Sequence, residues 1–379
     1  MKLCLSLFTV LLLTYHCSAQ QNCNSFTLKG TINTDTGVMQ LFPVRDISYY
    51  PYRTNLETGI DNGKFTFTDS IAYPTAYRLG LRINKSLRYL SDVFYIDPCV
   101  QTISCHIDSN WEMPAISNNT MRELTTKYNP CFKSVNLAFD KLYKTRDSLK
   151  KQFNNALPVL YSIALKNRED SLDKENIKLI VNYATKHPGS YLVLWKIAYL
   201  LHFGYYPAYE NAFAALSPTI RNSHTGSALA KELTALKSLS TGKHFPALQL
   251  LDTAFTQAAL PLIRKGQWYI LINFWKSDCT PCLKQFDAYK RIYAQYKNDG
   301  FQIISISVDK TNDVDNWQKA IKEKELPWPQ FLDLNGTNAT RLSIEAFPTN
   351  YLIDENGIII RKNISPEELE KLLAYNTKQ

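Results

Sequence analysis

Several features that would indicate other protein classes are missing from this chain of 379 residues. The net charge is +9, yet no run of five or more basic residues occurs, so the concentrated basic face typical of nucleic-acid binding is absent. The nucleotide-binding, hydrolase and zinc-protease patterns GxxxxGK, GxGxxG, GxSxG and HExxH are absent as well. We therefore expect no nucleic-acid partner and none of these chemistries.

Apolar runs long enough to cross a bilayer are also lacking. The N-terminus has an apolar run over residues 3–13 after a basic second residue, and this run is too short for a membrane span. A small-x-small pattern that ends at Ala19 follows, which is typical of a secretory signal peptide. We expect residues 1–19 to be cleaved near Ala19 and the mature protein to reach the periplasm or cell envelope. A lipoprotein anchored at Cys17 is disfavoured, because two bulky residues precede that cysteine.

The length predicts more than one domain. Residues 20–110 alternate apolar and polar positions in short runs such as FTLKGTI and GKFTFTDS, which predicts a small β-rich domain with a hairpin-type turn at Asn62-Gly63. Residues 111–240 repeat apolar positions at a spacing of three and four, which predicts a helical segment. Residues 241–379 alternate buried-strand and helix patterns, which predicts an α/β domain with a mixed sheet.

Cysteine is scarce once the signal peptide is set aside. Cys23, Cys99, Cys105 and Cys131 allow three pairings among themselves, and the sequence does not choose between them. The two remaining cysteines, Cys279 and Cys282, form a CxxC pair in the stretch WKSDCTPC. This pair could hold a metal, form a structural disulfide or pass electrons.

The surroundings of the CxxC pair favour electron transfer. Zinc needs four ligands, and no second CxxC or CxxH pair occurs, so we expect no metal. A structural disulfide within one helical turn would constrain little of the unfolded chain. The pair instead follows a buried-strand pattern and opens a helix, where unpaired backbone N–H groups stabilise the thiolate of Cys279. Cys282 should be more buried and resolve the mixed disulfide, while Pro281 fits the first helical turn.

The pattern FW…CTPC, followed about 65 residues later by FPTNYLID, resembles the thioredoxin fold. More narrowly, residues 241–379 resemble the exported TlpA/ResA-like thiol-disulfide oxidoreductases, which are often grouped as AhpC/TSA-type. The resemblance implies that Pro348 is a cis-proline beside the disulfide, flanked by Phe347 and Thr349. It also implies that the backbone of Phe347 pairs with an extended substrate segment. The implied architecture is an α/β thioredoxin-like domain after a small all-β domain of unknown function and a helical segment.

Four positions depart from the family pattern. Asp278 stands where the family has Trp, and Thr280 stands where it often has Gly or Glu. Asn273 and Gln285 replace the two acids that relatives place near the second cysteine. Because an adjacent carboxylate disfavours a thiolate, we expect Cys279 to be less acidic than in relatives and the pair to act as a reductant.

These observations predict dithiol–disulfide exchange with protein disulfide or thiol substrates. The electrons reside on the two sulfurs, so no cofactor is needed, and a reducing partner such as a membrane electron carrier must regenerate the pair. Trp275 lies close enough to report the redox state by fluorescence, and Asp309 is interpreted as a capping or loop residue. A peroxiredoxin would carry Pro and Thr before its cysteine, which this chain lacks. The alternative is a catalytically weak thioredoxin-fold module for binding or assembly in the cell envelope.

Overall fold

The computed structural model describes residues 24–52, 55–154, 157–202, 205–260 and 268–376. The chain divides into two compact units, Met1–Val44 with Tyr52–Lys127, and Arg45–Pro51 with Tyr128–Gln379. The signal peptide expected over residues 1–19 lies outside the described residues, and the boundaries expected at residues 110 and 240 stay a prediction. Strands, then helices, then a mixed region follow one another along the chain, as the changes of sequence period predict.

The first unit contains two sheets. One has the order β4-β1-β8-β9, and the other has the order β3-β2-β5-β6, with β7 paired to β5. The elements are β1 (Ser25–Thr31), β2 (Val38–Pro43), β3 (Leu56–Gly59), β4 (Lys64–Ser70), β5 (Thr75–Ile83), β6 (Ser86–Leu90), β7 (Phe94–Ile96), β8 (Cys99–Ser104), β9 (Ala115–Ile116) and α1 (Asn119–Glu123). Alternate residues of β1, including Phe26 and Leu28, are buried, as the period-two pattern predicts.

The turn predicted at Asn62-Gly63 is present. Both residues have positive φ, 49° and 70°, which is the conformation that a two-residue type I′ turn requires. Asp61 and Lys64 exchange backbone hydrogen bonds of 2.9 Å across it. The strands on either side, β3 and β4, belong to different sheets, so the turn connects the two sheets rather than closing a paired hairpin.

The N-terminal cysteines differ in their state. Cys99 takes part in a disulfide, and Cys23 lies outside the described residues. Cys105 is a free thiol, and burial raises its pKa to about 11. A thiol with that pKa stays protonated near neutral pH and is a poor nucleophile.

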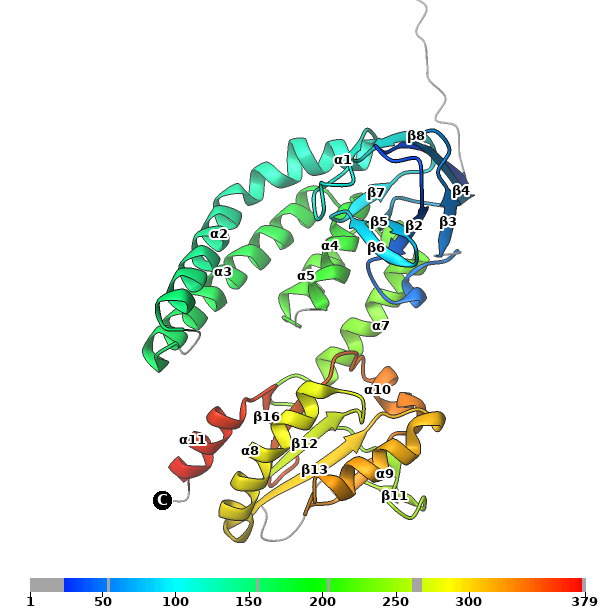
Figure 1. The fold of residues 1–379 in the computed structure, drawn as a ribbon. Coiled ribbons are helices and arrows are strands. Elements are labelled where there is room, and N and C mark those ends of the chain that lie inside the picture. The colour runs from blue at the N-terminus through cyan, green and yellow to red at the C-terminus, as the bar shows by residue number, and fades with distance from the viewer. Residues whose placement is uncertain (1–23, 53–54, 155–156, 203–204, 261–267, 377–379) are drawn as a thin grey trace, which may run out of the picture. The chain divides into compact units, whose positions relative to one another are not determined.

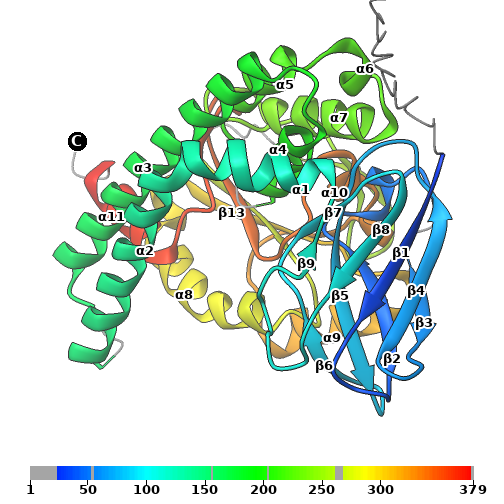
Figure 2. The same ribbon diagram turned by 90° about the horizontal axis from the view of Figure 1, so that it is seen from above.

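The second unit begins with helices. A short 3-10 helix spans Ile47–Tyr49. A π-helical turn, Leu124–Tyr128, runs from the end of the first unit into the longer helices of the second. These are α2 (Asn129–Gln152), α3 (Val159–Lys186), α4 (Tyr191–Leu201), α5 (Ala208–Ala215), α6 (Pro218–Arg221) and α7 (His224–Ser238). α2 and α3 run side by side (Figures 1 and 2), joined by an ion pair between Arg146 and Glu169 at 3.0 Å. Pro188-Gly189 separates α3 from α4, and the side chain of Ser190 caps the N-terminus of α4.

A seven-stranded mixed sheet organises the rest of this unit, in the order β11-β10-β14-β13-β12-β15-β16. Its strands are β10 (Gln249–Leu251), β11 (Gln257–Ala259), β12 (Tyr269–Trp275), β13 (Phe301–Ser307), β14 (Gln330–Leu332), β15 (Thr349–Asp354) and β16 (Ile359–Lys362). Its helices are α8 (Thr280–Tyr296), α9 (Val314–Glu323), α10 (Thr337–Arg341) and α11 (Pro366–Asn376), with 3-10 turns at Lys297–Asp299, Thr311–Asp313 and Leu334–Gly336. β12, β13 and β14 are parallel, whereas β15 runs antiparallel to β12. This is a thioredoxin-like arrangement of sheet and helices.

Two apolar layers sandwich this sheet. Phe286 of α8, Trp317 of α9 and Leu369 of α11 belong to the layer on one face. The other layer includes Ala339 of α10 and Phe245 from the segment before β10. α8 and α11 lie beside each other in Figure 1, on the face that also contains Cys282 and its neighbours. None of the helices in the described part of the chain has the length and apolar character that a bilayer span needs.

Candidate redox site

The CxxC pair lies where β12 ends and α8 begins. β12 is buried almost throughout, which the continuous apolar run of its sequence explains. Cys279 is the N-cap residue of α8, with extended backbone, and Pro281 lies in the first helical turn. The Sγ atom of Cys279 accepts a hydrogen bond of 3.2 Å from the backbone N–H of Cys282. Cys279 therefore occupies the position where a helix N-terminus stabilises a thiolate.

Cys279 and Cys282 form a disulfide, with their Cα atoms 5.3 Å apart. Cys282 is 1% exposed, whereas Cys279 is half-buried. The asymmetry follows from helix geometry, because the N-cap residue lies at the end of α8 and Cys282 faces the sheet one turn later. Cys279 is thus the sulfur that an incoming disulfide can reach.

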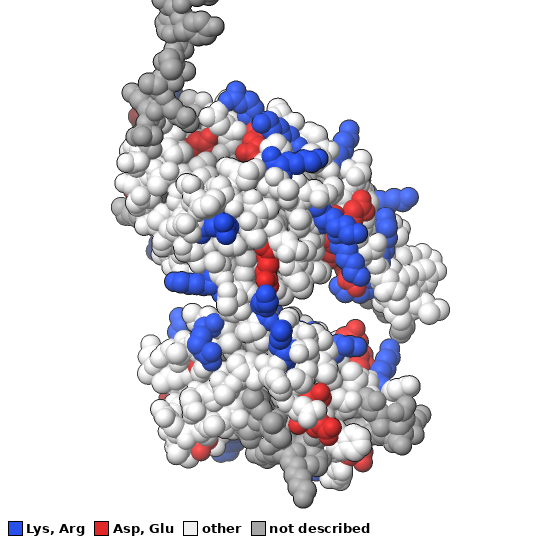
Figure 3. Space-filling model, turned by 180° about the vertical axis from the view of Figure 1, so that it is seen from behind, with Lys and Arg blue, Asp and Glu red and all other residues white. Residues whose placement is uncertain are grey.

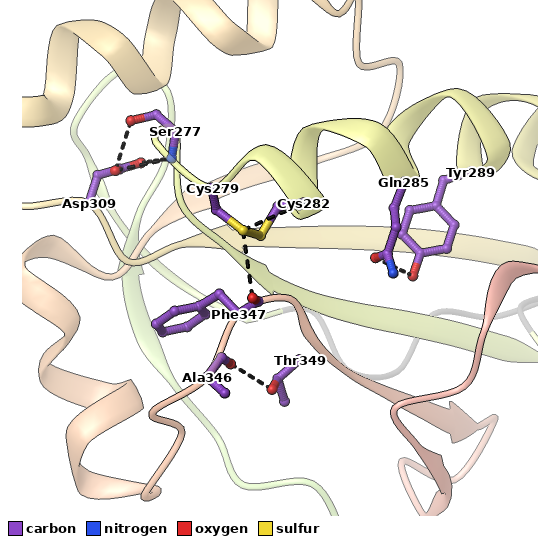
Figure 4. The surroundings of a disulfide bond; sticks show 9 residues. All are labelled: Ser277, Cys279, Cys282, Gln285, Tyr289, Asp309, Ala346, Phe347 and Thr349. Atoms are coloured by element: carbon purple, nitrogen blue, oxygen red, sulfur yellow. Dashed lines mark hydrogen bonds between the residues drawn. A yellow bond between two sulfur atoms is a disulfide. The ribbon is translucent and has the colours of Figure 1, made fainter. Parts of the chain in front are cut away.

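The loop before β15, about 65 residues later in the sequence, contacts this disulfide. The Phe347-Pro348 peptide bond is cis, and the carbonyl oxygen of Phe347 lies 3.6 Å from the Sγ of Cys279 (Figure 4). Thr349 Oγ1 donates a hydrogen bond of 2.8 Å to the carbonyl of Ala346 and thereby holds the loop. β15 pairs with β12 from Thr349 opposite Phe274 onward, which brings the loop to the end of β12.

Asp309 anchors the segment that precedes the cysteines. Its carboxylate is 2% exposed and accepts hydrogen bonds from the backbone N–H and Oγ of Ser277, at 2.9–3.2 Å, and from Ser307 Oγ at 2.5 Å. Figure 4 shows Ser277 and Asp309 facing each other beyond the start of α8. Asp309 was interpreted as a capping or loop residue, and it lies in the loop that follows β13. Its partner Ser277 was missed, because the 32 residues between them hide the contact.

Gln285 belongs to a polar group between α8 and β15, and Asn273 lies beside this group in the sheet. Asn273 is buried in β12 directly opposite Asn350 of β15. Asn350 donates to the hydroxyl of Tyr289 at 3.2 Å, and that hydroxyl donates to Gln285 at 3.4 Å. Burial raises the pKa of Tyr289 to about 12, so it stays protonated. The hydrogen bonds that link Gln285, Tyr289 and Asn350 therefore join neutral side chains.

The remaining predicted positions near the sulfurs differ in their exposure to solvent. Asp278, Thr280 and Pro281 are exposed, and each can contact a substrate. Trp275 is fully buried in the same apolar layer as Cys282 and packs edge-to-face on Phe286 at 5.0 Å. A buried tryptophan in that layer suits its expected use as a fluorescence reporter.

Figure 3 shows Lys and Arg side chains spread over the visible face with Asp and Glu among them. Within the described residues, no group of three or more His, Cys, Asp or Glu is placed to hold a metal ion.

Comparison with known proteins agrees with this geometry. Residues 241–362 match the AhpC/TSA family. The thiol-disulfide oxidoreductase ResA of Bacillus thuringiensis subsp. konkukian is 30% identical over 144 residues, which are 38% of this chain and 80% of that protein. A peroxiredoxin of Hyperthermus butylicus is 28% identical over 145 residues, 35% of this chain and 62% of that protein.

A solved thioredoxin domain of a thiol-disulfide oxidoreductase from Bacteroides vulgatus is 28% identical. The matched region covers 37% of this chain and 99% of the solved domain, with a TM-score of 0.33. The ResA match extends over most of that relative's length at 30% identity, and the CxxC pair lies within the matched family region. The chain is therefore an oxidoreductase and belongs to the ResA-like thiol-disulfide oxidoreductases of the AhpC/TSA family.

Proposed function

We propose that this protein reduces protein disulfides outside the cytoplasm by dithiol–disulfide exchange at Cys279 and Cys282. In the reduced protein, the Cys279 thiolate attacks one sulfur of a client disulfide. A mixed disulfide forms and the other client sulfur leaves as a thiolate. Cys282 loses its proton and attacks the Sγ of Cys279, which releases the second client sulfur. Two electrons pass to the client, and the protein is left with the Cys279–Cys282 disulfide.

One observation carries this proposal, the unequal access to the two sulfurs. Cys279 is half-buried at the helix N-terminus, whereas Cys282 is 1% exposed behind it. The carbonyl of Phe347 beside Cys279 offers an acceptor to the backbone of an extended client segment. In this proposal Cys279 attacks, Cys282 resolves, and the cis-proline loop at Pro348 shapes the groove.

The direction of exchange follows from the charges beside Cys279. The hydrogen bond from the Cys282 N–H favours the thiolate, whereas the neighbouring Asp278 carboxylate disfavours it. We expect a reduction potential closer to that of thioredoxin, about −270 mV, than to that of DsbA, about −120 mV. We also expect Asp278→Asn to lower the Cys279 pKa by about 0.5 unit, the effect of one nearby charge in water. The pH dependence of iodoacetamide alkylation measures it, and an unchanged or higher pKa would contradict the assignment.

The amide of Gln285, three residues after Cys282 on α8, leads us to expect slow resolution of the mixed disulfide. Cys282 must lose a proton before it attacks, and Gln285 and its partner Tyr289 cannot accept one near neutral pH. We expect Gln285→Glu to accelerate resolution by roughly 10-fold, since a positioned acid–base group contributes about 10²–10⁴-fold when fully aligned. Stopped-flow decay of a preformed mixed disulfide measures this rate. Gln295→Glu on an exposed face of α8 is the matched control, and equal effects of both variants would overturn the explanation.

A binding or assembly module is the second candidate, and the amides Asn273 and Gln285, which stand where the family resemblance implies acids, favour it. An insulin-reduction assay together with Cys282→Ser separates the two functions. An oxidoreductase gives cysteine-dependent reduction and a trapped mixed disulfide with its clients. A binding module gives neither, although it would still retain clients without a covalent bond. The proposed periplasmic or cell-envelope location and a membrane electron carrier as reductant are tested by fractionation and by identifying trapped partners.

A further inference from the structure

A cleft of about 640 Å³ opens beside the redox disulfide, within the second unit. Phe347, whose carbonyl lies 3.6 Å from the Sγ of Cys279, lines this cleft, and so does Lys276, three residues before Cys279. The other walls come from residues 46–49, α7, residues 308–310, α10 and residues 343–345. A client segment that pairs with the backbone of Phe347 would therefore place its neighbouring residues in the cleft.

Four basic side chains line the cleft, those of Lys231 from α7, Lys276, Lys310 and Arg341. Among the described residues, none of these four side chains lies within 4 Å of a carboxylate oxygen in an ion pair. Lys231, Lys310 and Arg341 are exposed, so their charges are available to a ligand.

The carboxylates of the cleft are already engaged within the protein. Glu232 accepts two hydrogen bonds of 2.7 Å from Arg45, which also lies 3.5 Å from Glu345. Asp46 accepts the backbone N–H of Ser48 at 2.9 Å, and this hydrogen bond lowers its pKa. Four cations and three carboxylates line the cleft. Arg45, which is paired with two of these carboxylates, adds a fifth positive charge, so the local net charge is +2. Among the described residues, the four lining cations are therefore the charges of the cleft without a carboxylate partner, and Arg341 donates instead to Asn338 Oδ1 at 3.2 Å.

We propose that this cleft binds an acidic segment next to the client cysteine, so that the protein prefers disulfides flanked by Asp or Glu. The inference rests on the proposed function and specifies its client class. Complementary charge speeds encounter and fixes the register of the bound segment. Each exposed charge pair changes binding by roughly two- to fivefold, so two or three pairs give about a tenfold preference at low salt.

Single-turnover reduction of three matched peptides tests the inference. Each peptide carries the same intramolecular disulfide, flanked on both sides by Glu, Gln or Lys, and is mixed with the prereduced full-length protein. We expect the Glu peptide to react about tenfold faster than the Lys peptide at low ionic strength. The difference should shrink in about 0.5 M salt, because the screening length is then only a few ångströms. Equal second-order rates for the three peptides would overturn the inference. Failure to reduce even the Gln peptide would instead overturn the proposed function.

A pair of charge variants separates the cleft from the net charge of the whole chain. Lys310→Gln with Arg341→Gln removes two cations of the cleft, and we expect it to lose most of the preference for the Glu peptide. Lys319→Gln with Lys322→Gln removes two exposed cations of α9 that do not line the cleft, and we expect the preference to remain. Equal losses in the two double variants would assign the preference to long-range charge and refute the cleft. Reduction of the Gln peptide and the melting temperature report whether each variant is folded.

Discussion

Replacing Cys279 with serine is expected to reduce the insulin-reducing activity by at least about 100-fold, the smallest loss usual when an essential nucleophile is removed. A serine hydroxyl is not ionised near neutral pH and cannot attack a disulfide sulfur. Cys282 cannot substitute for it, because its side chain is 1% exposed behind the first turn of α8. The measurement is the turbidity rate of insulin reduction with dithiothreitol as the electron donor.

The Cys282→Ser variant should behave differently. It retains the accessible Cys279, so it still attacks, but it cannot resolve the mixed disulfide and should accumulate as a covalent adduct. Cys105→Ser is the matched control, because burial raises the pKa of that thiol to about 11 and its loss should leave the rate unchanged. All variants are best made with Cys131→Ser, since Cys131 is exposed and reacts with thiol reagents. Activity that survives in Cys279→Ser would contradict the assignment of the nucleophile.

The elements around the disulfide could be predicted because local sequence determines them. The apolar run before Trp275 forms a buried strand, and a proline in the first turn with apolar positions every three or four residues forms α8. The burial difference between Cys279 and Cys282 then follows from their positions on one helix. The cis peptide before Pro348 follows from the family resemblance and is present in the structure.

Short elements escaped prediction because they carry too little pattern. β10, β11 and β14 have three residues each, and α10 has five. A strand of three residues shows hardly more than one period of alternation, so its place in the sheet depends on its neighbours. The Asn62-Gly63 turn shows a similar limit. Its conformation is local and was predicted, but the sheet to which each flanking strand belongs depends on long-range packing.

The polar contacts of the site could not be predicted either, because they also depend on long-range packing. The carboxylate of Asp309 and the backbone N–H of Ser277 meet because β12 and β13 are adjacent parallel strands. Arg45 and Glu232 are 187 residues apart in the chain, and no local pattern connects them. Contacts of this kind appear only when the fold is known, and they are the contacts whose loss is most costly.

Replacing Arg45 with methionine is expected to lower the stability of the second unit by about 3–5 kcal/mol, the usual cost of leaving one partner of a buried ion pair uncompensated. The side chain of Arg45 is 2% exposed and that of Glu232 is 7% exposed, with bidentate hydrogen bonds of 2.7 Å between them. Burial alone would lower the pKa of Arg45, but the Glu232 and Glu345 carboxylates outweigh it and raise that pKa. The guanidinium is therefore charged, and Met removes it while keeping the side-chain volume.

Thermal unfolding measures the effect, and a loss of this size corresponds to a fall of roughly 10 °C for a unit of this length. Arg291→Met is the matched control, because its pair with Glu370 at 3.5 Å is exposed and should be worth less than about 1 kcal/mol. Adding Glu232→Gln to Arg45→Met should restore most of the loss, since the amide oxygen still accepts from Tyr49 and the buried carboxylate is gone, while the remaining Glu345 carboxylate is 42% exposed and reaches water. If the double variant is as unstable as Arg45→Met alone, lost packing rather than an unpaired carboxylate causes the instability, and the electrostatic explanation is wrong.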